Sequence, residues 1–528
     1  MVNISGKIQP VILVILDGWG IAPPSQGNAI TLAKLPVFNK LIALYPTMVL
    51  QSAGEAVGLS WGESGNSEVG HLNLGAGQIV WQSLPLINRS IMDGSFFNNQ
   101  AFIQAIEHAK QNKSNLHLIG LTSNGGIHSS IDHLYALMEL AARNNFSRIY
   151  LHVILDGRDT AKDEGKGFIK DILSKIKSIG LGQIATLAGR FWAMDRDNHW
   201  ERIETVYLAM TKGLSEKEFS NPIKAVESSY KNGIYDEEFS PVVITSDTKP
   251  TGIIKDNDAI IFYNFRADRT RELAKAFVSE EFNGFKRDKF KNLFFVAMTE
   301  YEKNLPVVIA FPPVVIKNPL ARVISEMGLN QLHLAETEKY AHITFFFNGG
   351  REDPFEGEER ILIPSPRIPS YDQKPEMSAQ EVTHQILWAI DDSRYKYKFI
   401  AVNYANPDMV AHTGDLAATV KALEVLDGEL GRVVDLALKR DWVVVITADH
   451  GNAEALVNLR NGEIDKEHNA NPVPFIIVDK KLENKIPPDQ SPDLSLMTPM
   501  GVLSDVAPTI LKIMGIEKPE EMTGTSLI

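Results

Sequence analysis

Short apolar runs recur along the chain, and each is followed by glycine or by acidic, basic, amide or histidine side chains. Runs of about five to seven apolar, often β-branched residues are typical of buried strands. The pattern predicts strands at Val11–Leu16, Leu116–Leu121, Ile149–Leu155, Ile184–Ala188, Ile260–Phe265, Phe399–Asn403 and Trp442–Thr447.

Helical spacing occurs between several of these runs, most clearly after Gly414. There Leu416, Val420, Leu423, Leu430 and Val434 are expected on one apolar face, with Lys421, Glu424 and Glu429 elsewhere. Strands that alternate with helices predict an α/β fold with largely parallel sheets. In such sheets ligands bind beyond the carboxyl ends of the strands, where the polar residues of this chain stand.

The polar strand ends are of two chemical kinds. The first 80 or so residues and the last 210 or so supply Asp, Ser and His, whereas the middle supplies Arg. If the Asp and His residues bind metal together, the two ends of the chain form one domain and the middle is inserted into it. We therefore predict a discontinuous domain at 1–82 and 317–528, an inserted α/β domain at 87–311, and hinge linkers at 83–86 and 312–316.

Composition excludes several classes of protein. A length of 528 residues indicates about two to four domains. The chain has 53 basic and 66 acidic residues, so its net charge of −13 argues against a general binder of nucleic acid or anionic membranes. The absence of cysteine excludes disulfides, thiolate metal sites and a cysteine nucleophile. No apolar run approaches the roughly 18 residues of a membrane helix, and none has the flanks of a signal peptide, so we expect a cytoplasmic location.

Carboxylate and imidazole groups gather in three segments of the last 130 or so residues. Asp408 and His412 are four residues apart, so both leave one face if a helix begins near Asp408. Asp449 and His450 end a predicted strand, and His468 lies in a turn-rich loop. Each residue alone is more often a solvated or capping group, but together they favour a dinuclear metal site. Carboxylate and imidazole without sulfur suit Mn²⁺, Zn²⁺, Mg²⁺ or Co²⁺.

Ser67 stands between Gly65 and Gly70, which allow a backbone to approach a phosphate. A serine becomes a nucleophile when a metal lowers the pKa of its hydroxyl. The alternative is an N-cap serine that starts a helix, and without the metal residues this alternative is favoured. His71 is expected to be structural.

Arginines follow the strands in the middle of the chain, at Arg158, Arg190, Arg196, Arg266 and Arg269. Guanidinium groups bind phosphate and carboxylate oxygens bidentately, which suits a substrate that carries both groups. The alternative is surface ion pairing, since Arg269 lies beside Asp268. Lys339 lies in a polar stretch and, by itself, is expected to be solvated.

Four longer motifs are more specific than any single residue. They are Leu16-Asp17-Gly18-Trp19-Gly20, Gly65-Asn66-Ser67-Glu68-Val69-Gly70-His71, Asp156-Gly157-Arg158-Asp159-Thr160 and Asn264-Phe265-Arg266-Ala267-Asp268-Arg269. Together with Gly189–Arg196, Ala335–His342 and Phe347–Glu352, they resemble the cofactor-independent (2,3-bisphosphoglycerate-independent) phosphoglycerate mutases. The resemblance runs from Val11 to about Gly524.

The resemblance implies an outer domain of the alkaline phosphatase superfamily and assigns roles to residues. One metal would be held by Asp17, Ser67, Asp449 and His450, and the other by Asp408, His412 and His468. Ser67 would become phosphoserine, and Lys339 would stabilise the phosphoryl charge. The inserted domain would bind phosphoglycerate through His128, Arg158, Asp159, Arg190, Arg196, Arg266 and Arg269. Only the resemblance singles out Lys339 and His128.

The implied enzyme is an isomerase of glycolysis and gluconeogenesis that interconverts 3-phosphoglycerate and 2-phosphoglycerate. It would use two divalent ions, first of all Mn²⁺, need no 2,3-bisphosphoglycerate, and act as a monomer without nucleic-acid or membrane partners. The closest alternative is a metal-dependent phosphohydrolase or phosphopentomutase of the same superfamily. The arginine set suits a small acid phosphate better than a pentose phosphate. A sulfatase is disfavoured because no Ser-x-Pro-x-Arg sequence surrounds Ser67, and an inactive regulator because no expected ligand is missing.

Three positions depart from the family pattern, at Ala411, Ser64 and Gln78. The family usually has glycine, an apolar residue and arginine there. None of the three removes an expected ligand, so metal preference and substrate affinity are the properties they could shift.

Overall fold

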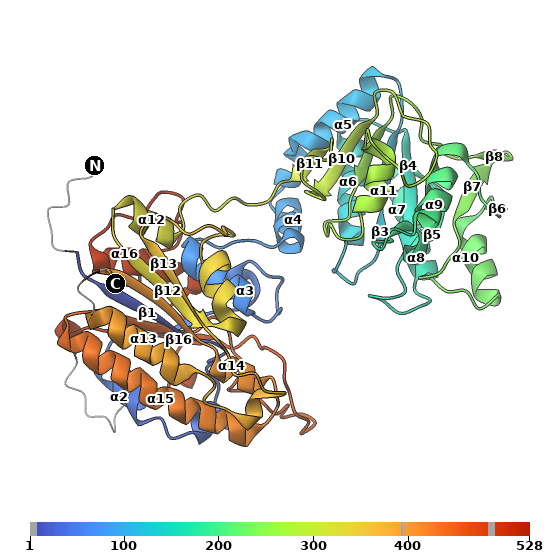
Figure 1. The fold of residues 1–528 in the computed structure, drawn as a ribbon. Coiled ribbons are helices and arrows are strands. Elements are labelled where there is room, and N and C mark those ends of the chain that lie inside the picture. The colour runs from blue at the N-terminus through green and yellow to red at the C-terminus, as the bar shows by residue number, and fades with distance from the viewer. Residues whose placement is uncertain (1–7, 392–393, 395, 484–491) are drawn as a thin grey trace. The chain divides into compact units, whose positions relative to one another are not determined.

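The computed structural model describes residues 8–391, 394, 396–483 and 492–528. The chain divides into two compact units, unit 1 at Met1–Gln82 and Val314–Ile528, and unit 2 at Ser83–Pro313. In Figure 1 the two coloured ends of the chain, blue and yellow to red, build unit 1, and the middle of the chain builds unit 2. The predicted α/β fold with one domain inserted into another is therefore confirmed.

Unit 1 is built on an eight-stranded sheet in the order β13-β12-β14-β1-β15-β16-β2-β17. Its strands are β1 (Val11–Leu16), β2 (Thr47–Gln51), β12 (Gln331–Glu336), β13 (Glu358–Ile363), β14 (Phe399–Tyr404), β15 (Val443–Thr447), β16 (Val473–Val478) and β17 (Gly501–Val502). The strands from β13 to β15 are parallel, and β16 is antiparallel to both of its neighbours. The start of β16 therefore lies at the same edge of the sheet as the ends of the parallel strands.

Helices cover both faces of this sheet (Figure 1). They are α1 (Ala29–Leu32), α2 (Pro36–Leu44), α3 (Ser67–Ala76), α12 (Leu320–Glu326), α13 (Ala379–Asp391), α14 (Asn406–Ala411), α15 (Leu416–Lys439) and α16 (Val506–Met514). Shorter helical turns are η1 (Gly54–Val57), η3 (Thr337–Lys339), η4 (His342–Phe346), η5 (Tyr371–Gln373), η6 (Lys480–Leu482), η8 (Leu494–Leu496) and η9 (Leu503–Asp505).

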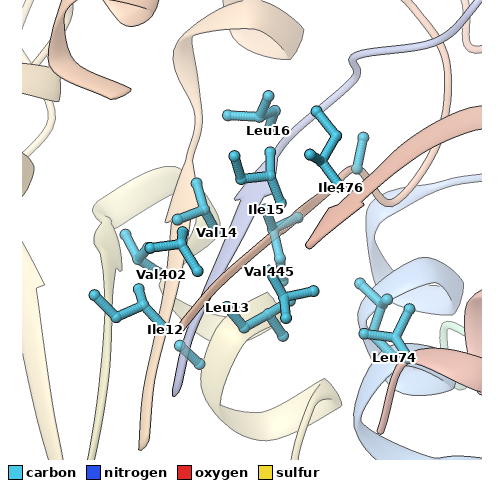
Figure 2. Packing of buried hydrophobic residues seen from close by; sticks show 14 of the residues in the cluster. Ile12, Leu13, Val14, Ile15, Leu16, Leu74, Val402, Val445 and Ile476 are labelled. Carbon is cyan, nitrogen blue, oxygen red and sulfur yellow. The ribbon is translucent and has the colours of Figure 1, made fainter. Parts of the chain in front are cut away.

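The central strand β1 shows why the apolar runs become strands. All six of its residues are buried, and they pair in parallel with β14 on one side and β15 on the other. Figure 2 shows its side chains near Val402 of β14, Val445 of β15 and Ile476 of β16. A strand that is covered on both faces cannot alternate apolar with polar residues, so it reads as a continuous apolar run.

Unit 2 contains a second sheet in the order β11-β10-β9-β3-β4-β5-β7-β6, with β8 paired to β7. Its strands are β3 (Leu116–Thr122), β4 (Ile149–Leu155), β5 (Gln183–Gly189), β6 (Glu218–Phe219), β7 (Val242–Ser246), β8 (Lys249–Pro250), β9 (Ala259–Phe262), β10 (Phe294–Thr299) and β11 (Val308–Phe311). Its helices are α4 (Ser83–Met92), η2 (Ser95–Asn98), α5 (Gln100–Gln111), α6 (Ile131–Arg143), α7 (Gly165–Ile179), α8 (Arg190–Ala193), α9 (Trp200–Lys212), α10 (Pro222–Lys231) and α11 (Arg271–Val278). The strands from β11 to β5 are parallel.

One local prediction needs correction, and one side chain is buried where its sequence gave no sign of it. The run Ile260–Phe265 outlasts its strand, because β9 ends at Phe262 and the side chain of Asn264 then accepts the backbone N–H of Leu121 at 2.8 Å. On α15, Glu429, which was placed off the apolar face, is buried and accepts a hydrogen bond from Arg432 at 2.7 Å.

The predicted linkers lie at the boundaries between the units. Residues 83–86 form the first turn of α4, while 312–316 carry no regular secondary structure. Their action as hinges and the domain bounds stay predictions. Among the described residues, no helix combines the length and the apolar character needed to span a membrane.

Candidate active site

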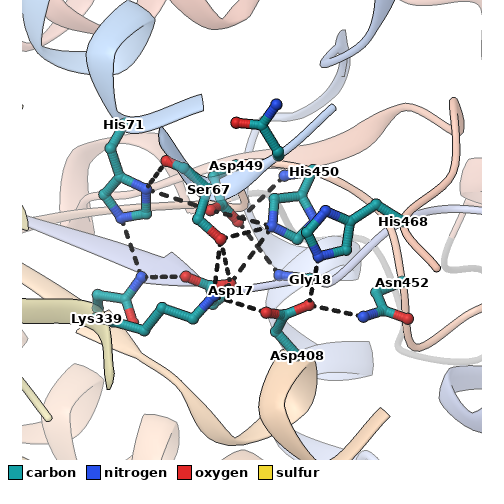
Figure 3. A network of polar contacts seen from close by, with 12 residues as sticks. Asp17, Gly18, Ser67, His71, Lys339, Asp408, Asp449, His450, Asn452 and His468 are labelled. Carbon is teal, nitrogen blue, oxygen red and sulfur yellow. Dashed lines mark hydrogen bonds and ion pairs between the residues drawn. The ribbon is translucent and has the colours of Figure 1, made fainter. Parts of the chain in front are cut away.

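The ends of three adjacent strands bring the acidic and histidine residues of unit 1 to one edge of its sheet. Asp17 follows β1, the α14 segment with Asp408 follows β14, and Asp449 with His450 follows β15. His468 precedes the antiparallel β16 and so reaches the same edge. Segments from both ends of the chain therefore meet at one point, as Figure 3 shows.

Ser67 is the first residue of α3 and points into this cluster. The N-cap of α3 is Asn66, whose side chain accepts the backbone N–H of Val69 at 2.9 Å, so the N-cap alternative for Ser67 is wrong. Glycine is required beside it, because a Cβ on Gly70 would lie 2.7 Å from the Cβ of Asp449. The small residue lets α3 approach the end of β15.

The Ser67 hydroxyl is surrounded by charged groups. Lys339 Nζ lies 2.7 Å from Ser67 Oγ, His450 Nε2 lies 2.9 Å from it, and Asp17 Oδ1 lies 3.4 Å from it. Lys339 is only 4% exposed, so the expectation of a solvated lysine, which its local sequence favours, is wrong. It is carried there by η3, directly after β12.

Lys339 is held as an ammonium ion by its neighbours. Its Nζ lies 2.7 Å from Asp17 Oδ1 and 2.6 Å from Asp408 Oδ2. Although burial lowers the pKa of Lys339, Asp17, Asp408 and Asp449 raise it well above the ordinary value. In turn, burial raises the pKa of Asp408, but Lys339 and the nearby histidines hold it well below the usual range. Opposite charges that share a buried site stabilise each other's charged forms.

The geometry around Asp408 fits a divalent cation. His412 donates from Nδ1 to the carbonyl oxygen of Lys466 at 2.7 Å, so the lone pair of the neutral ring is on Nε2. This Nε2 lies 3.4 Å from Asp408 Oδ1 and 3.0 Å from His468 Nε2. His468 Nε2 is also 3.2 Å from Asp408 Oδ1, so two imidazoles and a carboxylate converge as ligands of a metal ion do.

A second group of possible ligands lies beside the first. Asp17, His71 and Asp449 offer ligand atoms within 4.8 Å of one another, as do Asp408, His450 and His468. Among the described residues, buried Asp449 Oδ2 has no hydrogen-bond partner, which leaves a carboxylate oxygen available to a cation. Although burial lowers the pKa of His450, nearby carboxylates, chiefly Asp449, raise it to about 9, so a bound metal would displace a proton there.

All seven predicted ligands therefore lie in or beside one cluster, and these residues could hold divalent metal. Their division between two ions stays a prediction. Two buried amides of the cluster were missed by sequence reasoning. Asn452 donates to Asp408 Oδ1 at 2.7 Å, and Asn403 donates to Asp17 Oδ2 at 2.6 Å. Asn452 follows Asp449-His450-Gly451, and Asn403 ends an apolar run, so strand-end position was the available signal.

The predicted residues of unit 2 also meet at one edge of their sheet. His128, Arg158, Arg190 and Arg266 follow β3, β4, β5 and β9, which are parallel neighbours. Burial lowers the pKa of Arg269, and the charges of Arg196, Arg190 and Arg158 lower it further, which places four guanidinium groups near one another.

These arginines differ sharply in exposure and partners. Arg190 is 3% exposed and donates from Nη1 to Asp156 Oδ1 at 2.6 Å and to Asp159 Oδ2 at 2.5 Å. Three of the others are largely exposed: the side chains of Arg158, Arg196 and Arg266 are 57%, 48% and 53% exposed. Asp156 was not identified from the sequence as a site residue, although it is the first residue of the Asp156-Gly157-Arg158-Asp159 motif. Its ion pair holds Arg190 in place.

Asp268 is the counter-ion of this group. Its carboxylate lies 3.1 Å from Arg196 Nη1 and 3.2 Å from Arg266 Nε, with His128 Nδ1 at 3.6 Å. The ion pair suggested by adjacency in the sequence is different, because Arg269 donates to the carbonyl oxygen of Met194 at 3.0 Å. Such half-exposed ion pairs are weak, so an incoming anion can compete for the arginines.

Comparison with known families gives two matches. Residues 87–303 match the model described as "BPG-independent PGAM N-terminus (iPGM_N)", and residues 357–516 match the model described as "Sulfatase". The first match lies in unit 2 and the second in unit 1.

Relatives match nearly the whole chain. A protein of Moorella thermoacetica named 2,3-bisphosphoglycerate-independent phosphoglycerate mutase is 48% identical, with 98% of each chain covered. One of Clostridium acetobutylicum with the same name is 50% identical, over 98% of this chain and 99% of its own. A solved phosphoglycerate mutase of Leishmania mexicana, studied at low cobalt concentration, has 28% identity and a TM-score of 0.56, and covers 99% of this chain and 98% of its own.

Proposed function

Because the chain belongs to the family of 2,3-bisphosphoglycerate-independent phosphoglycerate mutases, we propose that it interconverts 3-phosphoglycerate and 2-phosphoglycerate in glycolysis and gluconeogenesis. The observation that carries the proposal is the environment of Ser67. A buried hydroxyl is contacted by an ammonium group, an imidazole and a carboxylate, at 2.7, 2.9 and 3.4 Å. This is the arrangement of an activated oxygen nucleophile.

Ser67 is the proposed acceptor of the phosphoryl group. Divalent metals bound to the carboxylate and histidine residues would supply Lewis-acid activation of Ser67 and neutralise phosphate charge. The proposed ligands are Asp17, Ser67, Asp449 and His450 for one ion and Asp408, His412 and His468 for the other. The Ser67 oxygen attacks phosphorus, phosphoserine forms, and the glycerate oxygen leaves.

Lys339 binds the phosphoryl group during this transfer. Its ammonium already lies 2.7 Å from Ser67 Oγ, so it can follow charge that develops on the transferring oxygens without a change of position. Positive charge that is preorganised in a buried site needs no reorganisation as the reaction proceeds.

The arginines of unit 2 bind the glycerate. In the proposal His128, Arg158, Asp159, Arg190, Arg196, Arg266 and Arg269 hold the acid between the two transfers. The glycerate reorients, its other hydroxyl takes the phosphoryl group from Ser67, and the isomer is released. No 2,3-bisphosphoglycerate is needed, because the serine stores the phosphoryl group.

The finer properties are part of the same proposal: two metal ions per chain, Mn²⁺ as the preferred metal with Co²⁺, Zn²⁺ or Mg²⁺ as substitutes, a monomer, and a cytoplasmic location. The match to a sulfatase model does not favour sulfate esters, because Ser67 lacks the Ser-x-Pro-x-Arg surroundings.

An assay without 2,3-bisphosphoglycerate tests the function. Metal-stripped protein should convert 3-phosphoglycerate only after Mn²⁺ or Co²⁺ is added, and excess chelator should abolish turnover. Acid quenching during turnover should trap labelled phosphate on Ser67. Turnover that persists in excess chelator, or release of free phosphate without any 2-phosphoglycerate, would refute the proposal in favour of metal-free chemistry or a phosphohydrolase.

A further inference from the structure

Asn403 lies near the end of β14, and its side chain contacts Asp17, which follows β1, and His71 of α3. Both Asn403 and His71 are fully buried, and neither is among the expected metal ligands or substrate-binding residues. Asn403 Nδ2 lies 2.6 Å from Asp17 Oδ2 and 3.0 Å from His71 Nε2. One amide nitrogen therefore contacts a carboxylate and an imidazole at once.

The carboxylate decides which way the Asn403 amide points. An ionised carboxylate can only accept hydrogen bonds, so the Asn403 atom beside Asp17 must be the NH₂ group. The same NH₂ group has a second hydrogen for His71, so His71 Nε2 must accept. A neutral imidazole that accepts at Nε2 carries its proton on Nδ1.

The proton on Nδ1 then determines what His71 does. His71 Nδ1 lies 2.8 Å from the backbone oxygen of Ser67, to which it donates, and 3.2 Å from Asp449 Oδ2 (Figure 3). With its hydrogen on Nδ1 and its Nε2 lone pair engaged by Asn403, His71 has no free lone pair for a cation. It therefore differs from His412, whose Nε2 lies 3.4 Å from Asp408 Oδ1 and has its amide neighbour, Asn452 Nδ2, only at 3.5 Å.

We propose that Asn403 is a positioning residue of the transfer site. Its hydrogen bond to Nε2 fixes His71 as a donor at Nδ1, and this keeps Ser67 and Asp17 in a fixed position relative to each other. The connection runs from Asp17 through the Asn403 amide and the His71 ring to the backbone of Ser67. It leaves Asp449 Oδ2 available to metal, and it removes His71 from the ligand set despite its place beside Asp17 and Asp449. The inference rests on the proposed function, because it concerns how residues are held for metal and for phosphoryl transfer.

The test uses two variants that cut the connection from opposite sides. Asn403→Leu keeps the shape and removes both donors, and His71→Phe keeps a ring and removes both nitrogens. The matched control is Asn73→Leu. Asn73 is a buried amide of α3, the helix of His71, and within the described part of the chain its amide bonds only to backbone groups of Val57, Val69 and Val80. Because His71→Phe cuts the same connection, the proposal can be tested even if Asn403→Leu does not fold.

Calorimetric titration of metal-stripped protein with Mn²⁺ measures the number of ions bound and their Kd. For both variants we expect the number bound to equal that of the parent protein, with Kd weakened about 10- to 100-fold. At saturating Mn²⁺, kcat should fall about tenfold or more while KM stays within twofold. The double variant should lose less than the product of the single losses, because both cut one connection. Asn73→Leu should lower the melting temperature but leave Kd within twofold.

Contrary outcomes are clear. A Kd within twofold of the parent for both variants, or losses no larger than those of Asn73→Leu, would overturn the positioning role. Loss of one bound Mn²⁺ in His71→Phe alone would show that His71 is a ligand, which also overturns it. Failure of the proposed function would look different, because the parent protein itself would then bind no Mn²⁺ or would not isomerise phosphoglycerate.

Discussion

The two candidate sites differ in how far most of their charged side chains are buried. In unit 1, Asp17, Asp408 and Asp449 are fully buried around Lys339, which is 4% exposed. In unit 2, the side chains of Arg196 and Arg266 are 48% and 53% exposed. Charges removed from water interact strongly but cost much to bury, whereas exposed charges are screened. Unit 1 is thus preorganised for chemistry and depends on every partner, while unit 2 can bind and release an anion at small cost to its own stability.

The largest effect is expected for Ser67→Ala, which tests whether the chemistry takes place in the buried site of unit 1. If the chemistry belongs to the buried site, removal of the nucleophile should lower both isomerisation and phosphoserine-dependent hydrolysis by about a thousandfold or more. Both products are measured in one reaction. Ser64→Ala, which removes a half-buried hydroxyl of the same loop, should retain activity. A Ser67→Ala enzyme with substantial mutase activity would place the chemistry elsewhere.

Lys339→Met tests whether a buried charge contributes more to the free energy of unfolding than an exposed one. It leaves Asp17 and Asp408 buried without their cation, so the free energy of unfolding of metal-free protein should fall by about 3–5 kcal/mol. Lys480→Met removes an ion pair of the same unit in which both side chains are more than half exposed, and it should cost less than about 1 kcal/mol. Denaturant titrations of the two variants are compared directly. Equal losses would contradict the difference between buried and exposed charge.

Arg266→Ala tests unit 2 as a binding surface. The substitution removes a half-exposed arginine, so unfolding should change by less than about 1 kcal/mol. Mutase activity should fall about 10- to 100-fold, as expected when a charge-assisted hydrogen bond worth roughly 1.5–3 kcal/mol is lost. Glycerate that is poorly held should leave before the second transfer, so the ratio of released phosphate to 2-phosphoglycerate should rise.

Lys212→Ala provides the control for Arg266→Ala. Lys212 also belongs to a half-exposed ion pair of unit 2, with Asp288, but it lies in α9, away from the strand-end arginines. It should leave both the rate and the product ratio unchanged. A parent-like rate and KM for Arg266→Ala would mean that the arginines serve only as surface ion pairs.

The smallest expected effect is the pH dependence contributed by His128. Burial, followed by the charge of Arg190, lowers the pKa of His128 to about 4. Unfolded histidine titrates near pH 6.5, so below that pH the unfolded state binds the proton first, and stability falls until the pH reaches about 4. Between pH 7.5 and 5.5 the loss should be about 1 kcal/mol.

His128→Gln isolates this contribution. Every other titratable group remains, so the difference between the two stability profiles over pH 7.5 to 5.5 belongs to His128. Denaturant titrations at each pH measure it. Parallel profiles would mean that the buried ring accepts a proton as readily in the folded as in the unfolded state.

Local patterns predicted β1, β14 and β15 in the middle of one sheet and β3, β4, β5 and β9 in the other, but not the remaining strands of either sheet. A strand that is buried on both faces is a run of consecutive apolar residues, so it can be recognised locally. The run Val11–Leu16 coincides with β1, and Ile149–Leu155 coincides with β4. The helical pattern of α15 gave no sign that Glu429, which was placed off the apolar face, is buried. A helical pattern locates the apolar stripe but not the width of the surface that neighbouring segments cover.

Residue type at strand ends identified the acidic, histidine and arginine candidates, and only the family resemblance singled out Lys339 and His128. Neither predicted which of these side chains are buried or what they pair with. From its local sequence Lys339 is expected to be solvated, and nothing in the sequence distinguishes the exposure of the five arginines. The structure buries Lys339 and also Arg190, which two aspartates engage. Exposure and pairing depend on distant segments, so a local window contains no information about them.

The sequence by itself determined the alternation of strand and helix, the two chemical kinds of strand ends, and the motifs that mark the family. Each of those properties depends on residues that are close together in the sequence. Only the tertiary structure decided that Lys339 meets Ser67 across 272 positions of the chain and that Asn403 bridges Asp17 and His71. It also decided that Lys339 and its carboxylate partners are buried, whereas Arg196 and Arg266 are half-exposed. The physical reason is that hydrogen bonds and desolvation act over a few ångströms in space, and folding alone brings such distant segments to that range.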